Sequence, residues 1–458
     1  MHNIIPVTIF FGLIAFSGWS VLSALDMRER MSPAQALALS YGIGMGAVSL
    51  EVFFIFLFGA KATLLKLFFP WVSLSVFNMA KRRLYVPATG KMKKEKMTGL
   101  EKFLLCGISC EVIYAFFRAI IFPMESYDAV AIWAIKAKAI FLAGGLPVGF
   151  FTNMNYIESH LDYPLLVPLG EAVFYFIAGG IRDALVKCIF PSYFAAFVVL
   201  FYFVLTRFLD RRKSLLCTFL LGTIPQFKEF ATNGYADFVV SFYYTMGFLF
   251  LYLWFVEGKR EYLLVAGLFS AMCAWTKNEG YSLCILNLLV ALAMVFLKTA
   301  RGDRQQLFDA TIGISFYIVA VVMCVFPWEA FKASLGIKSD LLARETFSLV
   351  RAFKNISRLP MIAYEYQKQF FGFKKWNLIW VLFLVTFIVN LKRSFSGRML
   401  FITISILAAL GTYTVVYIVT PKNFGWHLST TASRLFIHIV PLAVFWLAMM
   451  LKELKVDL

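Results

Sequence analysis

Long apolar runs recur along the whole chain and constrain its fold more than any other feature. Stretches of about 20 residues, such as 3–25, 100–123 and 399–420, hold few charges, and a helix of that length crosses the hydrocarbon core of a bilayer. Hydrophobic residues make up 61% of the chain and charged residues only 15%, which is far from the balance of soluble domains. Backbone polar groups in lipid must be satisfied within each span. We therefore predict an all-α polytopic membrane protein.

The formal net charge of +18 also fits nucleic-acid binding in principle. The sequence lacks a nucleic-acid motif, however, and its Lys and Arg residues gather in the turns between apolar runs. Basic residues in such turns anchor the cytoplasmic side beside anionic headgroups. We expect membrane lipids, and not nucleic acid, as their partner. The seven cysteines lie in or beside apolar runs, which favours core packing over disulfides or a metal cluster.

Basic turns set the expected orientation, because short cytoplasmic turns are rich in Lys and Arg. The strongest is 81–98, with seven Lys or Arg and one Glu. If this turn lies in the cytoplasm, the span 100–123 runs outward. The run 164–180, which Glu and Pro interrupt, is then a juxtamembrane or re-entrant helix on the outer side. The outer loop 331–375 departs from the rule with nine Lys or Arg, as long loops often do.

About thirteen spans result from this orientation, although the third is also compatible with a position along the membrane surface. They are 3–25, 33–59, 61–80, 100–123, 187–206, 214–226, 237–256, 262–276, 281–297, 308–330, 376–391, 399–420 and 435–451.

Four polar stretches fall on the predicted outer face. The first of them holds Asp128, with Glu125 three residues before it and Lys136 and Lys138 after it. An Asp at a helix start is often only an N-cap, so a capping role and a catalytic role both stay open for Asp128. The two lysines suit a lipid phosphate or simple snorkelling to the membrane surface. The four stretches are 124–163, 225–237, 276–281 and 421–434.

Further charged candidates lie later in the first stretch and in the second and third stretches. His160 and Asp162 precede a Tyr-Pro pair, and the histidine fits a metal ligand, a proton carrier or an ordinary loop residue. Asp237 lies where a loop enters a span, a costly place for an acid that lacks a partner, although an N-cap role is again possible. Lys277 and Glu279 interrupt apolar sequence and either pair with each other or bind a ligand.

His427 and Arg434 are seven residues apart and share a face if their segment is helical. Two acids on separate loops, here Asp128 and Asp237, can share a divalent cation or divide into base and stabiliser. Converging Lys and Arg side chains suit a phosphate leaving group. Together these residues predict group transfer from a membrane-held phosphate donor.

The order of these motifs resembles the GT-C superfamily of integral-membrane glycosyltransferases, in the bacterial branch of aminoarabinose transferases and protein O-mannosyltransferase-like proteins. The stretches "YDAVAIWAIKAKAIF", "HLDYPLLVPL", "TKNEG" and "WHLSTTASRLFIHIVP" carry the resemblance, which covers 100–300 best. It implies a polyprenyl-phosphate-linked sugar as donor and a lipid, glycan or protein acceptor. It also implies an inner-membrane protein that works on the periplasmic face.

Residue roles follow from the same resemblance. Asp128 matches the acid that acts as base. Asp237 matches a second acid that helps to hold a divalent cation in some relatives, so a cation shared by Asp128 and Asp237 is expected here. Lys277 matches a donor-phosphate lysine, for which Lys136, Lys138 and Arg434 are further candidates. A single displacement at the sugar would invert its anomeric centre.

The resemblance implies a GT-C-type bundle in three regions. They are the N-terminal spans and basic loop (1–99), the catalytic membrane module (100–300) with its outer loop (124–186), and the C-terminal spans (301–458) with the loop 331–375. A transporter or flippase of a lipid-linked or small anionic substrate is the main alternative. Transporters place charges near the bilayer midplane on broken helices, whereas these charges cluster in loops and at the mouths of spans.

Overall fold

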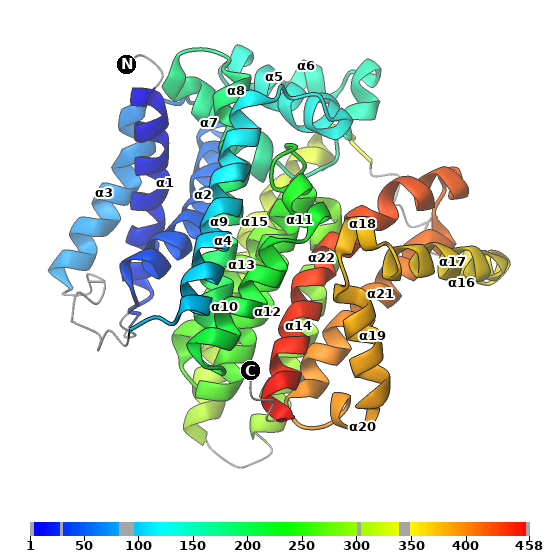
Figure 1. Ribbon diagram of the computed structural model, residues 1–458. Coiled ribbons are helices and arrows are strands. Elements are labelled where there is room, and N and C mark those ends of the chain that lie inside the picture. Colours follow the sequence, from blue (N-terminus) through cyan, green and yellow to red (C-terminus); the bar gives the residue numbers. More distant parts are fainter. Residues whose placement is uncertain (1–3, 28–30, 82–95, 300–303, 339–348, 455–458) are drawn as a thin grey trace.

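Every regular element in the described part of the chain is a helix (Figure 1). The structure, a computed structural model, describes residues 4–27, 31–81, 96–299, 304–338 and 349–454. Nine helical segments among these residues are long and apolar enough to cross a membrane. They lie in α1 (Ile4–Ala24), α2 (Pro33–Leu57), α4 (Gly99–Ile121), α8 with α9 (Asp183–Val186, Ile189–Leu205), α12 (Ala236–Glu257), α14 (Asn278–Thr299), α15 (Arg304–Ser334), α21 (Met399–Val419) and α22 (Phe424–Glu453). The predicted class, an all-α polytopic membrane protein, is confirmed.

The predicted number of thirteen spans is not confirmed. Helices occupy the four remaining predicted places, but they are shorter: α3 (Leu64–Ala80), α10 (Arg211–Gly222), α13 (Arg260–Thr276) and α19 (Ile379–Val389). The 12 residues of α10 rise only about 18 Å, well short of a hydrocarbon core of about 30 Å. Gly222 and Pro225 explain the early end, because Pro225 opens the separate helix α11 (Pro225–Phe230).

A layer of short helices follows α4 at one end of the bundle (Figure 1). The run 164–180 forms α7, which is 13 residues long and buried from Leu166 to Tyr175. It packs against α1, α2 and α5, so it lies inside the protein and not along its surface. The other members of the layer are η1 (Ala129–Ala134), α5 (Ile135–Ala143), α6 (Val148–Phe151) and η2 (Met154–Ser159).

Close backbone contact joins α1 to α2. A Cβ atom on Gly18 would lie 1.8 Å from the carbonyl oxygen of Ser40, and one on Gly44 would lie 1.9 Å from that of Ile14. Neither distance is possible for real atoms, so these positions require glycine. Small residues that let helix backbones approach are the usual basis of helix association in membranes.

Gly18→Ala is expected to destabilise the protein by about 1–3 kcal/mol, because the added methyl group must push α1 away from α2. Thermal unfolding in one detergent measures the effect. Gly12→Ala on the same helix is the matched control, since a Cβ there meets nothing within 4 Å. The same melting temperature for both variants would contradict this account of the contact.

Candidate functional site

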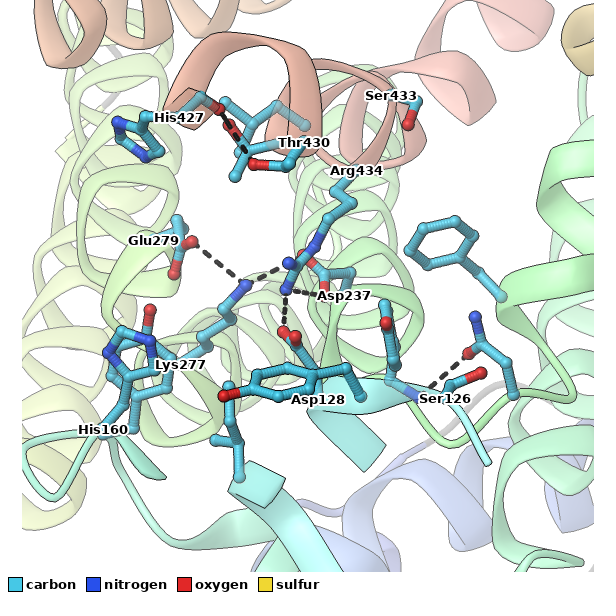
Figure 2. Close-up of a pocket in the computed structure, with 18 of the residues that line it drawn as sticks. Ser126, Asp128, His160, Asp237, Lys277, Glu279, His427, Thr430, Ser433 and Arg434 are labelled. Atoms are coloured by element: carbon cyan, nitrogen blue, oxygen red, sulfur yellow. Dashed lines mark hydrogen bonds and ion pairs between the residues drawn. The ribbon is translucent and has the colours of Figure 1, made fainter. Parts of the chain in front are cut away.

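A cavity of about 450 Å³ opens at the end of the bundle where the short helices lie, and all four polar stretches contribute to its lining (Figure 2). Asp128 directly precedes η1, and Asp237 lies in the first turn of α12. Lys277 joins α13 to α14, and Arg434 projects from α22. Residues more than 300 positions apart in the chain thus meet at one place, as the alternating directions of the spans predicted.

Arg434 bridges the two aspartates of the cavity (Figure 2). Its Nη2 donates to Oδ2 of Asp128 and, at 3.2 Å, to Oδ2 of Asp237. The Lys277 Nζ lies 2.9 Å from Oδ1 of Asp237 and 3.1 Å from Oε1 of Glu279. The Asp237 side chain is fully buried and that of Lys277 is 3% exposed. Two cations and three carboxylates therefore form one network, in which Asp237 and Lys277 are buried and Glu279 is 25% exposed.

The capping alternatives for the two aspartates are wrong. Asp128 has helical backbone angles and its side chain makes no capping hydrogen bond. Asp237 lies beyond Tyr235, the N-cap residue of α12. Each carboxylate instead accepts a hydrogen bond from Arg434 of α22. A residue that only caps its own helix would not need such a partner.

A second layer supports this network from inside the bundle. His438, one turn deeper than Arg434 on α22, is fully buried, and its Nδ1 lies 2.8 Å from the hydroxyl of Tyr413. Its Nε2 lies 3.8 Å from Oδ1 of Asp237. The Arg434 guanidinium also lies over the Tyr235 ring, 5.1 Å from its centre. The Tyr235 ring thus supports the guanidinium, and His438 lies next to the Asp237 carboxylate without a hydrogen bond to it.

A divalent cation finds no ready site in this arrangement. Both oxygens of Asp237 and Oδ2 of Asp128 are engaged by Arg434 and Lys277. Within the part of the chain that is described, His, Cys, Asp and Glu side chains form no group of three that fits a metal ion. The residues as placed therefore do not fit the predicted divalent cation, which stays a prediction.

Lys136 lies outside the cavity, contrary to its predicted place at a donor phosphate. It is fully buried, and its ammonium group lies 5.5 Å from the ring centres of both Trp133 and Tyr163. Its Nζ donates to the backbone carbonyl of His160 at 2.5 Å. The φ angle of His160 is +49°, a conformation that a residue with a side chain adopts at a cost. Lys136 therefore positions a residue of the cavity wall.

Lys138 also lies outside the cavity lining and forms an ion pair with Asp183 at 2.7 Å. Glu125 is exposed and does not line the cavity either. Asp162 accepts a hydrogen bond from Asn278 at 2.6 Å, which ties its loop to the start of α14. Lys138 and Asp162 therefore bind other residues of the protein.

His160, Glu279 and His427 do line the cavity. The His160 ring stacks on the Tyr163 ring, with 4.5 Å between the two ring centres. Burial and then the nearby cations, Lys422 first, lower the pKa of His160 to about 3, so this imidazole is neutral at physiological pH. His427 is held through its Nδ1 by the hydroxyl of Thr420 at 2.9 Å.

Sequence reasoning missed several polar residues of the lining. Lys422 lies in the turn between α21 and α22, and its place in the stretch 421–434 was the available signal. Gln226 and Glu229 lie on α11, inside the stretch 225–237. Glu158 lies in η2, inside the stretch 124–163.

Burial of Lys136 predicts a pH-dependent stability. Burial lowers its pKa from 10.5 to about 7, partly opposed by Asp162. Between these pH values the unfolded chain binds more protons than the folded one, so stability rises with pH across that window. The melting temperature of the wild type relative to Lys136→Met is expected to climb from pH 7 to pH 10. If wild type and Lys136→Met showed the same dependence of melting temperature on pH, the burial of Lys136 would not explain the effect. Lys138→Met, which changes a partly exposed lysine, serves as the control.

The apolar bundle and the charged cavity at its end together define the class: a multi-pass membrane protein of helices with a polar site at the helix ends. No protein-family model matches the chain, and no curated protein is significantly similar to it.

Proposed function

We propose that this protein is a membrane glycosyltransferase that moves a sugar from a polyprenyl-phosphate-linked donor to a lipid, glycan or protein acceptor. One observation carries the proposal: a single cavity at the end of a membrane bundle places the Asp128 carboxylate beside the cations Arg434 and Lys277. A base next to cations is what transfer from a sugar phosphate needs. The resemblance to GT-C enzymes supports the same donor class and an outer-face site in the inner membrane.

In the proposed step, the acceptor hydroxyl gives its proton to Asp128. The acceptor oxygen then forms a bond to the anomeric carbon while the bond from that carbon to the phosphate oxygen breaks. The electron pair stays on the phosphate, whose negative charge Arg434 and Lys277 stabilise. Attack from the face opposite the leaving phosphate inverts the anomeric centre.

Arg434 has two roles in this proposal, because its guanidinium binds the Asp128 carboxylate as well as the cavity's proposed donor phosphate. A carboxylate that accepts a hydrogen bond from a guanidinium is a poor base. A donor phosphate competes for the same guanidinium and so frees Asp128 when the donor binds. Base activation would thus depend on donor binding.

A transporter or flippase is the second candidate, since apolar spans surround a charged cavity. The position of the charges argues for the enzyme, because Asp237 and Lys277 lie where α12 and α14 begin and not at breaks within long helices, as in transporters.

Liposomes that contain the purified protein and a panel of polyprenyl-phosphate sugars test the proposal. An active donor with an acceptor is expected to release free polyprenyl phosphate, and NMR is expected to show an inverted anomeric centre in the product. Movement of the intact lipid-linked sugar across the bilayer without cleavage would support the transporter. A retained configuration would contradict the single-displacement step.

A further inference from the structure

Residues 349–376 form short helices that run crosswise to the neighbouring spans. In Figure 1 the helices α16 and α17 extend sideways from the ends of α19 and α21. α19 begins three residues after α18 ends, and α21 ends beside the same segment. The four elements are α16 (Leu349–Lys354), η3 (Ile356–Arg358), α17 (Leu359–Phe370) and α18 (Phe373–Trp376).

Hydrogen bonds attach the segment to the end of α21. Arg358 donates through Nη1 to the carbonyl oxygens of Ile418 at 2.8 Å and of Tyr417 and Thr420 at 3.3 Å. Asn355 donates to Ile418 as well. These carbonyls belong to the last turn of α21 and the residue after it, where a helix leaves acceptors unsatisfied. The segment is therefore held at the end of a span.

Helix α17 carries apolar side chains on both faces, because Tyr366 and Phe370 pack against Phe436 of α22 while other apolar side chains are exposed. Its inner face buries Ile362, Glu365 and Gln369, and the two polar side chains bond to each other at 3.0 Å. The outward side chains of the segment are largely apolar. Exposed large apolar residues are Val350, Phe353, Ile356, Leu359, Met361, Tyr364, Phe371 and Phe373.

The same segment is strongly basic, with six Lys or Arg against the single acid Glu365. Glu365 already pairs with Lys368 at 2.6 Å. Lys354, Lys374 and Lys375 are exposed. Apolar side chains among basic ones, on helices that cross the ends of spans, are typical of a helix lying in the membrane interface.

We infer that residues 349–376 lie in the bilayer surface and bind anionic lipid headgroups through Lys354, Lys374 and Lys375. The exposed apolar side chains enter the acyl boundary, while the lysines reach the phosphates of the same leaflet. The inference does not depend on the proposed function. It also accounts for the basic loop 331–375 that departs from the charge rule, because its lysines meet lipid directly.

Hydrogen exchange of the full-length protein in nanodiscs tests the inference. Amides of 350–376 are expected to exchange about fivefold more slowly in discs with anionic phosphatidylglycerol than in purely zwitterionic discs, since each lysine near an anionic surface contributes to binding. Lys354→Gln/Lys374→Gln/Lys375→Gln should remove the difference. The control Lys102→Gln/Lys392→Gln/Arg393→Gln removes three exposed charges elsewhere and should keep it.

Unchanged exchange in α12 verifies that each triple variant is folded. The inference fails if exchange in 350–376 is the same in both kinds of disc. It also fails if protection appears only when a second protein is added, because the surface would then be a protein-docking site.

Discussion

Asp128→Asn is expected to slow sugar transfer by about 10²–10⁴-fold, the range that a positioned general base contributes. The amide keeps the size of the side chain and a hydrogen-bonding oxygen, but it cannot take the acceptor proton. Arg434 and Lys277 are untouched, and the amide competes less than the carboxylate for the Arg434 guanidinium, so donor affinity should stay the same or rise. Release of polyprenyl phosphate, followed at several concentrations of a donor identified in liposomes, measures both the transfer rate and the donor affinity.

Asp183→Asn is the matched control for this loss. Asp183 also pairs with a cation, Lys138 at 2.7 Å, but it lies outside the cavity. Its variant should therefore transfer sugar at the wild-type rate. Equal rates for wild type and Asp128→Asn would remove Asp128 from the chemical step.

Arg434→Met is expected to destabilise the fold by about 3–5 kcal/mol, the cost of leaving a buried charge without its partner. The side chains of Arg434 and Asp128 are only 16% and 10% exposed. Asp237 keeps Lys277 as its partner, so the loss should fall mainly on Asp128. Thermal unfolding in detergent measures the change.

The double variant Asp128→Asn/Arg434→Met should recover part of that loss, since it removes the unpaired carboxylate. Lys138→Met, at a half-exposed pair, should cost no more than about 1 kcal/mol. A double variant as unstable as the sum of its single changes would show that the two residues do not interact.

The sequence was sufficient to locate the long helices and to bring the main charged residues together. Apolar runs between basic turns predicted alternating spans, and that alternation puts Asp128, Asp237, Lys277 and Arg434 at one end of the bundle. The network itself was not predictable, because a guanidinium shared by Asp128 and Asp237 depends on how α12 and α22 pack. Spacing along the chain says nothing of that contact.

The role of Lys136 was also beyond the sequence. Residues Ala129–Ala134 form a π-helical turn, which holds more residues than an α-helical turn and so shifts the faces that follow. An α-helical pattern cannot show this shift. Lys136 therefore points into the protein at the His160 carbonyl, where sequence reasoning expected a lipid phosphate.

Photolabelling with a polyprenyl-phosphate sugar that carries a diazirine on the sugar tests whether the cavity binds the donor. The label is expected on peptides 226–237 and 422–434 around the cavity, and unlabelled donor is expected to prevent it. Labelling confined to the apolar groove between α2 and α3, or labelling that excess donor does not reduce, would contradict the account.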